Sequence, residues 1–341
     1  HKAIRRQRQM CIRDRIYTDE IYNNTQETLV VGKEYAITTY NIGFGAYNHD
    51  FSFFMDQGKM LSGEKVKGKL SKATSKEIVL TNTRGAIEEI TAFNPDFAFF
   101  QEVDTNSTRS FQVNQFKMLQ ESLAKMASVH VSNFHSAYLF YPILDPHGVV
   151  NSGIATFSKY KIDKVIRKSL EITDAFPSKF FDLDRCFSAS YLKTNHDNYL
   201  VIVNVHLSAY DKGGVYRKKQ LQQLNSFLEV EYQKGNYVVC GGDFNHDIAN
   251  SMYVFETKQE KPEWVYALNN DDLNENFSFA TNNNIPTCRS TDMPYEKNVN
   301  YTVVLDGFIV SKNVDVIMVE NVDTNFEYSD HNPVYMKFVL K

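Results

Sequence analysis

Polar residues whose side chains could take part in a chemical reaction follow an apolar run past the middle of the chain. The stretch GGDFN at residues 241–245 comes directly after Tyr237–Cys240 and presents Asp243 and Asn245. Asp, Asn and Gly are ordinary turn formers, because they tolerate left-handed backbone angles. They also suit an active site, since α/β proteins place reacting groups at strand ends and glycine lets the backbone approach closely. The rest of the chain decides between these two interpretations.

The same arrangement recurs along the chain, where short apolar runs end in or contain acidic, amide or imidazole groups. A single such residue is usually a turn former or a satisfied hydrogen-bond partner. Their repetition indicates one site built from several strands. The motifs are TYN with Asn41, FQEVD with Glu102, NVHLS with His206, GGDFN with Asp243 and Asn245, LDGFIVS with Asp306, and YSDHNP with Asp330 and His331.

In this order and at these separations, the motifs resemble those of the endonuclease/exonuclease/phosphatase superfamily. That superfamily includes pancreatic-type deoxyribonucleases, apurinic/apyrimidinic endonucleases, neutral sphingomyelinases and inositol polyphosphate phosphatases. The resemblance extends from about Tyr35 to Leu340. It implies two packed mixed β-sheets flanked by helices, which is a four-layer α/β sandwich.

The resemblance also implies roles for the motif residues. Asp306 would orient His331, His206 would stabilise charge on the phosphoryl group, and Asp243, held by Asn245, would orient or deprotonate water. Whether Asp243 or His331 is the base stays open. The implied catalytic residues are His206, Asp243, Asn245, Asp306 and His331, and the implied metal ligands are Asn41, Glu102 and Asp330.

Magnesium is the expected cofactor, and Mn²⁺ is expected to substitute for it. Carboxylate and amide oxygens of Glu102 and Asn41 suit a hard cation, and no Cys/His cluster indicates zinc. The number of metal ions stays open. Arg185 and Arg289 are candidates for substrate phosphate binding, with a surface or ion-paired role as the alternative for each.

These residues predict a Mg²⁺-dependent phosphoesterase, most simply a phosphodiesterase that works by metal-assisted attack of water. The alternatives are an endonuclease on DNA of deoxyribonuclease or abasic-site type, a sphingomyelinase-like phospholipase, and a catalytically inactive binding protein on the same fold. GGDFNHDIAN departs from the pattern of the inositol phosphatases. The expected partner is a phosphodiester substrate, whether nucleic acid, phospholipid headgroup or small molecule. No protein partner is implied, and a monomer is expected.

The elements that must position these residues are short strands and a few helices. Apolar runs bounded by turn residues outnumber segments with helical spacing, which predicts an α/β sandwich rather than a regular βαβ alternation. The strand-like runs are Tyr35–Tyr40, Phe97–Phe100, Gly153–Phe157, Ser188–Leu192, Leu200–Val205, Tyr237–Cys240, Val303–Val310, Val314–Val319 and Val334–Leu340. The helical segments are Ile78–Phe93, Phe111–Met126 and Arg217–Tyr232.

With 341 residues, 43% of them hydrophobic, the chain is long and apolar enough for a large core. No linker divides it, so residues 35–341 are expected to form one catalytic domain and 16–34 an N-terminal extension. A lysine-rich segment at residues 58–76 is expected to be a solvated loop, with a substrate-facing role as the alternative. Cys186, Cys240 and Cys288 have no paired spacing and are expected to be buried thiols.

Residues 1–15 differ in composition from the rest and are interpreted as a non-native arm. They carry six Lys or Arg against one Asp, a net +5 that, removed from the total of −4, leaves −9. An acidic body disfavours broad binding to a phosphate backbone, although a local basic groove is compatible with it. No apolar run of membrane-spanning length occurs. Localisation stays open, since a non-native arm would mean that the true start, with any signal or anchor in it, has been lost.

Overall fold

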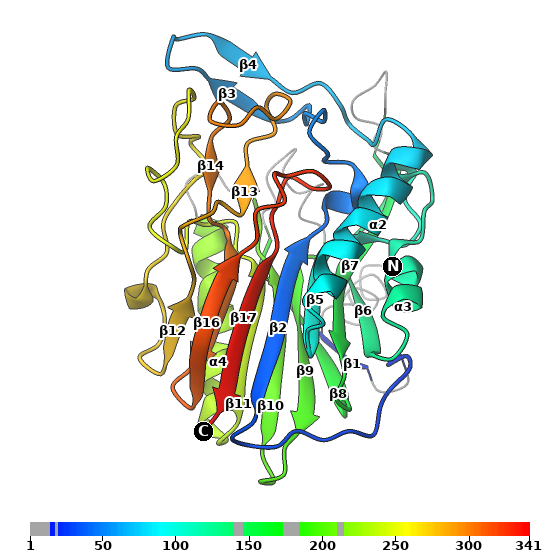
Figure 1. Cartoon of the computed structure of the whole chain (residues 1–341), viewed down its shortest axis with the longest axis vertical. Coiled ribbons are helices and arrows are strands. Elements are labelled where there is room, and N and C mark those ends of the chain that lie inside the picture. Colours follow the sequence, from blue (N-terminus) through cyan, green and yellow to red (C-terminus); the bar gives the residue numbers. More distant parts are fainter. Residues whose placement is uncertain (1–13, 18–19, 140–145, 147, 173–183, 210–214) are drawn as a thin grey trace, which may run out of the picture.

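Two large β-sheets pack face to face at the centre of the molecule (Figure 1). The computed structural model describes residues 14–17, 20–139, 146, 148–172, 184–209 and 215–341. In spatial order, the six-stranded sheet contains β16 (Val314–Asn321), β17 (Val334–Leu340), β2 (Glu34–Asn41), β5 (Phe97–Asp104), β7 (Gly148–Ser158) and β6 (Ala127–Leu139). The seven-stranded sheet contains β1 (Asp14–Tyr17), β8 (Lys164–Ser169), β9 (Cys186–Lys193), β10 (Tyr199–His206), β11 (Tyr237–Asp243), β15 (Asp306–Ser311) and β12 (Phe277–Ala280).

A parallel strand pair lies at the centre of each sheet and brings polar strand ends to one edge. β2 pairs in parallel with β5, so that Asn41 lies opposite Gln101. β10 pairs in parallel with β11, so that His206 lies opposite Asp243. Because parallel strands end at the same edge of a sheet, these pairings gather the polar ends of four strands.

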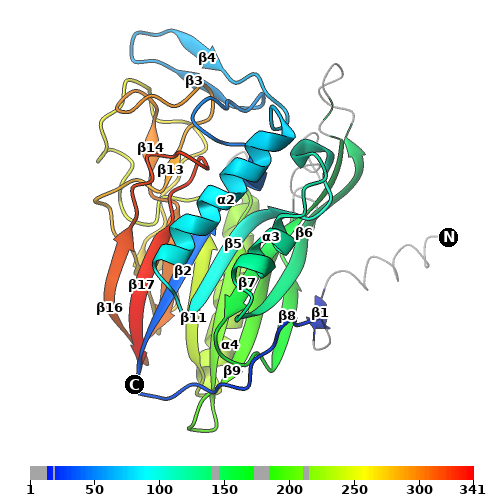
Figure 2. The ribbon, with the colours of Figure 1, turned by 45° about the vertical axis from the view of Figure 1, so that its right-hand side comes forward.

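Helices cover the outer face of each sheet, which confirms the predicted four-layer sandwich (Figures 1 and 2). Helix α4 (Val215–Gln233) packs Leu221, Leu224 and Leu228 against the outer face of the seven-stranded sheet. Helices α2 (Lys76–Ala92) and α3 (Gln115–Ser122) cover the outer face of the six-stranded sheet. A separate apolar core fills the space between the sheets.

Three predicted or missed elements on the two sheets and their helices differ from the sequence prediction. The helix expected over Phe111–Met126 begins only at Gln115, because Phe111 and Gln112 have left-handed φ angles of 53° and 54°. The long strand β6 was not predicted, although apolar residues such as Val129 and Val131 alternate with polar ones and face the inter-sheet core. Likewise, the run Val303–Val310 divides into β14 (Thr302–Val303), which pairs with β13 (Cys288–Arg289), and β15.

The lysine-rich segment is not a plain loop but contains a small antiparallel hairpin. Strands β3 (Gln57–Lys59) and β4 (Lys65–Lys67) pair across a turn in which Gly63 has a φ of +93°. Lys59 forms an ion pair of 2.6 Å with Glu260. The hairpin lies at the end of the molecule toward which β2 runs (Figure 1), so the segment is ordered beside the polar edge of the sheets.

The described part of the N-terminal region is attached to both sheets. Asp14 and Arg15, the described residues of the proposed arm, lie in β1, which pairs antiparallel with β8. Leu29, in the 16–34 extension, is fully buried in the inter-sheet core. Residues 1–13 lie outside the described residues. None of the helices in the described part of the chain is long and apolar enough to span a membrane. The described cysteines, Cys186, Cys240 and Cys288, are buried free thiols as expected.

The two glycines before Asp243 are required by close strand packing. A Cβ on Gly242, whose φ is +145°, would lie 1.9 Å from the carbonyl oxygen of Val205 in β10. A Cβ on Gly241 would lie 2.4 Å from the ring of Phe308 in β15. Glycine therefore lets β11 lie tightly between its neighbours, and this holds Asp243 at the edge of the sheet.

We expect Gly242→Ala to destabilise the protein by more than about 2 kcal/mol, because the added methyl group collides with backbone at a strained φ. Chemical denaturation measures the change. Gly32→Ala is the matched control: Gly32 also has a positive φ, +86°, but open space around its Cβ position. A Gly242→Ala variant as stable as Gly32→Ala would contradict the packing explanation.

Candidate active site

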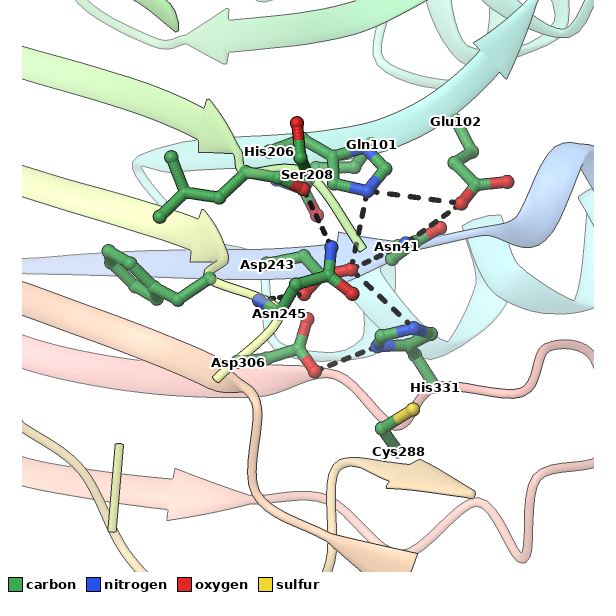
Figure 3. A network of polar contacts seen from close by, with 12 residues as sticks. Asn41, Gln101, Glu102, His206, Ser208, Asp243, Asn245, Cys288, Asp306 and His331 are labelled. Atoms are coloured by element: carbon green, nitrogen blue, oxygen red, sulfur yellow. Dashed lines mark hydrogen bonds and ion pairs between the residues drawn. The ribbon is translucent and has the colours of Figure 1, made fainter. Parts of the chain in front are cut away.

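The residues of all six motifs converge on the carboxylate of Asp243, at the end of β11 (Figure 3). Its Oδ2 accepts a hydrogen bond of 3.0 Å from the Asn41 side chain and lies 3.5 Å from His206 Nε2 and 3.6 Å from His331 Nε2. Its Oδ1 accepts a 2.8 Å bond from the backbone N–H of Asn245. Burial raises the pKa of Asp243 to about 6. The two sheets thus hold one carboxylate among two imidazoles and an amide.

His331 and Asp306 form a tight pair beside Asp243. His331 Nδ1 lies 2.8 Å from Asp306 Oδ2, so the carboxylate fixes the orientation of the ring and leaves Nε2 facing Asp243. Burial by itself would lower the pKa of His331, but Asp306, Cys288 and Asp243 outweigh it and hold that pKa well above its usual range. The geometry matches the orienting pair that the resemblance implied.

His206 lies on the opposite side of Asp243, at the end of β10, and differs from His331 electrostatically. Burial and, to a smaller extent, the positive charge of Arg185 hold the pKa of His206 well below its usual range. Its Nε2 also lies 4.0 Å from Glu102 Oε1. The two histidines therefore favour different protonation states, with His206 neutral and His331 protonated.

Glu102 reaches the site through an irregularity in β5. The pairing of β5 with β7 shifts between Phe100 and Val103, and Glu102 has a left-handed φ of 55°. Such a conformation is strained for a residue other than glycine and is typical of functional sites. The bulge directs the carboxylate toward Asn41, whose amide nitrogen lies 3.3 Å from Glu102 Oε1.

The donor set fits a hard divalent cation. Carboxylates of Glu102, Asp243 and Asp330 all line one pocket, and oxygen donors of this kind bind Mg²⁺. Asn41 presents its amide nitrogen to Glu102, while its Oδ1 accepts the N–H of Gly43 at 3.0 Å. A metal-ligand role for Asn41 would therefore require a half-turn of this amide. Asp243, Asp306 and His331 form a second compact group whose ligand atoms lie within 4.8 Å of one another.

Asp330 lies in an environment that disfavours its charge. Burial raises its pKa from an ordinary 3.8 to about 7, and repulsion from Glu102 adds to this while His331 opposes it. In metal-free protein, Asp330→Asn should therefore raise the unfolding temperature at pH 8, where the native carboxylate is charged at a cost. The gain should vanish as the pH falls toward 4, where the native carboxyl group is protonated. Thermal scans in EDTA across this range test it, and an unchanged or lower unfolding temperature at pH 8 would contradict it.

Sequence reasoning assigned no role to three buried polar residues that position the site, namely Gln101, Asn204 and Arg217. Gln101 Nε2 donates to Asn204 Oδ1 at 2.8 Å and so connects β5 to β10 across the two sheets. Arg217 of α4 donates to the backbone carbonyl of Asn245 at 3.2 Å. The side chain of Asn245 itself donates to the carbonyl of Leu207 at 2.7 Å. Gln101 and Asn204 were visible beside Glu102 and His206, but only the packing of the sheets shows that they meet.

The two candidate phosphate-binding arginines have different surroundings, although both line the pocket. The Arg289 side chain is 2% exposed and donates to the backbone carbonyls of Asn48, at 2.9 Å, and Phe51, at 3.3 Å. This geometry gives Arg289 a structural role in holding the segment after β2. Arg185, just before β9, is half-buried and lies in the wall beside His206.

Comparisons with known proteins agree with this geometry. A model of the endonuclease/exonuclease/phosphatase family matches residues 38–331. The inositol phosphosphingolipids phospholipase C of Schizosaccharomyces pombe is 24% identical over 245 residues, which cover 63% of this chain but only 58% of that protein.

Solved structures show the same fold at low identity. An endonuclease/exonuclease/phosphatase protein of Beutenbergia cavernae has a TM-score of 0.61 at 14% identity, with 90% of this chain and 72% of that one covered. TDP2 of D. rerio, solved with a single-strand DNA product, has a TM-score of 0.55 at 13% identity, with 90% and 99% covered. Because the family model spans all six motifs that meet at Asp243, the chain belongs to the endonuclease/exonuclease/phosphatase family.

Proposed function

We propose that this protein is a Mg²⁺-dependent phosphodiesterase. The proposal rests on the arrangement around the buried carboxylate of Asp243. The imidazoles of His206 and His331, which favour opposite protonation states, and the amide of Asn41 surround it. A phosphodiester resists water because its own charge repels nucleophiles. Its hydrolysis requires an oriented water, a proton acceptor and donors for the phosphoryl oxygens, and this site supplies groups for each.

Glu102 and Asp330, with Asn41 after rotation of its amide, would hold the cation. When bound, the cation would neutralise charge on the phosphoryl oxygens and on the leaving oxygen. The protein's own side chains carry the other steps.

We assign Asp243 as the base that orients water and accepts its proton, because its pKa of about 6 suits that transfer near neutral pH. His331 is held protonated by Asp306 and therefore donates a hydrogen bond from Nε2 to a phosphoryl oxygen rather than accepting a proton from water. His206, neutral and fixed at the end of β10, donates a second hydrogen bond to the phosphoryl group.

A phospholipase C activity on a phosphosphingolipid is the second candidate. The observation in its favour is the sequence similarity to the inositol phosphosphingolipids phospholipase C of Schizosaccharomyces pombe. This chain spans little more than half of that protein's length, and its six motifs resemble those of a superfamily with several substrate classes. The assignment to a lipid substrate is therefore a proposal of its own.

A substrate panel tests both proposals. The purified chain with Mg²⁺ is assayed on bis-p-nitrophenyl phosphate, sphingomyelin vesicles, inositol phosphosphingolipid vesicles, plasmid DNA and abasic-site duplex. Turnover of bis-p-nitrophenyl phosphate supports the phosphodiesterase, and preferential release of the lipid headgroup supports the second candidate. Binding without turnover of any substrate would instead favour a catalytically inactive protein on this fold.

A further inference from the structure

One wall of the active-site pocket consists of hydrogen-bond donors instead of carboxylates. We call it the donor side and define it as Arg109, Asn133, Ser152 and Arg185, all of which line the pocket. The pocket-lining carboxylates of the described chain are Asp56, Glu102, Asp243 and Asp330. None of them lies in β6, in β7 or in the described residues just before β9, from which Asn133, Ser152 and Arg185 come. The pocket is therefore divided into an acidic side and a donor side.

Asn133 is directed into the pocket by a bulge in β6. The register of β6 with β7 shifts between Ser132 and Phe134, which leaves Asn133 as the extra residue. Bulges beside active sites commonly change the direction of a side chain. Asn133 is only 2% exposed, yet its Nδ2 has no hydrogen-bond partner among the described residues. A buried donor without a partner costs free energy, so its retention in the pocket wall points to a ligand.

Ser152 repeats this feature on the neighbouring strand. It lies opposite Phe134 in the β6–β7 pairing, and two residues before Ile154, which faces the inter-sheet core. The side chain of Ser152 therefore faces the cleft between the sheets. It is 2% exposed, and its Oγ has no hydrogen-bond partner in the part of the chain that the structure describes. Two adjacent strands thus each place a residue with an unsatisfied buried donor in the wall of the same cavity.

Buried contacts fix the positions of the donor-side residues. The Arg109 guanidinium donates to Asp104 through Nε at 3.0 Å and Nη2 at 2.9 Å, and lies 3.8 Å from the centre of the Phe44 ring. Arg167 of β8 donates to the carbonyl of Ser132 at 3.1 Å and to that of Asp184 at 2.7 Å. These carbonyls directly precede Asn133 and Arg185, so one buried arginine holds both in place.

From these observations we propose that the donor side binds a second anionic group, of the phosphate class, on the same substrate whose ester bond is hydrolysed. An amide N–H, a hydroxyl and guanidinium groups all donate hydrogen bonds, and phosphate oxygens accept them. The same wall disfavours a cationic headgroup, since it offers that group no carboxylate. The inference rests on the proposed phosphodiesterase function, and it narrows the substrate to a molecule with a second phosphate near the reacting one.

Two chromogenic esters that differ by one phosphate provide the kinetic test. Thymidine 5′-(p-nitrophenyl phosphate) and its 3′-phosphorylated form are compared with the full chain and Mg²⁺. We expect kcat/KM to be about tenfold or more higher for the 3′-phosphorylated ester, mainly through a lower KM, because charge-assisted hydrogen bonds form only with that ester. Asn133→Asp should abolish this preference, since it replaces a donor that has no partner among the described residues with a repelling acceptor.

The matched control is a pair of serine variants. Ser152→Ala should reduce the preference, whereas Ser136→Ala should not, because Ser136 is also a buried serine of this sheet with an unpartnered Oγ but does not line the pocket. Equal kcat/KM for the two esters in the native protein would overturn the proposal, as would a preference that Asn133→Asp leaves intact. No turnover of either ester would instead contradict the phosphodiesterase function.

If neither ester is turned over, a binding measurement still tests whether the donor side binds an anion, independently of the phosphodiesterase function. Calorimetry with inorganic pyrophosphate in EDTA removes any contribution of the cation. The native protein and Ser136→Ala should bind with the same affinity, and Asn133→Asp should bind about tenfold or more weakly. Pyrophosphate binding that is absent from the native protein, or equal in Asn133→Asp, would show that the donor side is not an anion site. Thermal unfolding of each variant verifies that it is folded.

Discussion

Asp243→Asn is expected to lower kcat by about two or more orders of magnitude while leaving the fold intact. The carboxylate lies 3.5 Å and 3.6 Å from the two histidine Nε2 atoms, and no other described carboxylate lies within ion-pair distance of both rings. An amide keeps the shape of the side chain but is no proton acceptor. Steady-state kinetics on the best substrate measure the loss, and circular dichroism verifies the fold.

Two comparisons sharpen this prediction. Asp292→Asn is the control, because Asp292 is a buried carboxylate that accepts a hydrogen bond from Gln259 outside the active-site pocket; its kcat should stay near normal. Within the site, His331→Ala and Asp306→Asn should each lower kcat, but the double variant should be little worse than His331→Ala, since Asp306 acts through His331. Near-normal turnover in Asp243→Asn, or additive losses in the pair, would show that these roles are wrong.

Removal of divalent metal should abolish turnover. Glu102, Asp243 and Asp330 place three carboxylates in the pocket that receives a negatively charged phosphodiester, and without a cation these charges repel the substrate and the developing negative charge. Activity should disappear in EDTA and return with Mg²⁺ or Mn²⁺.

Glu102→Gln distinguishes a cation in this pocket from one elsewhere. The variant keeps the shape of the side chain but removes one ligand charge, so the Mg²⁺ concentration for half-maximal activity should rise by about tenfold or more. The surface variant Glu121→Gln, in a residue outside the pocket, should leave that concentration unchanged. Full activity in a rigorously metal-free sample would contradict the metal-dependent mechanism, whereas an unchanged Mg²⁺ requirement in Glu102→Gln would place the cation away from Glu102.

Short apolar runs and the polar residues that end them were enough to predict the sandwich and the motif residues. The strand Tyr237–Cys240 and the helix Arg217–Tyr232 both formed, because a short continuous apolar run suits a strand that is buried on both faces, and a repeat of leucines determines which face of a helix is buried. The β3–β4 hairpin was missed because its strands are polar and mostly exposed, so no apolar period marks them. Strand β6 was missed although Val129 and Val131 alternate with polar residues, because only its pairing with β7 shows that this alternation is a strand.

By itself the sequence determined which residue types stand at the strand ends, and hence that a phosphoester site was possible. Only the tertiary structure decided how they meet: Asn41 and Glu102 come from one sheet, and His206 and Asp243 from the other, so their separation depends on how two faces pack. The same packing directed Arg289 to backbone carbonyls and left Asn133 and Ser152, in the pocket wall, without a hydrogen-bond partner among the described side chains and backbone groups. Hydrogen bonding and burial depend on neighbours in space, and a linear pattern specifies only neighbours along the chain.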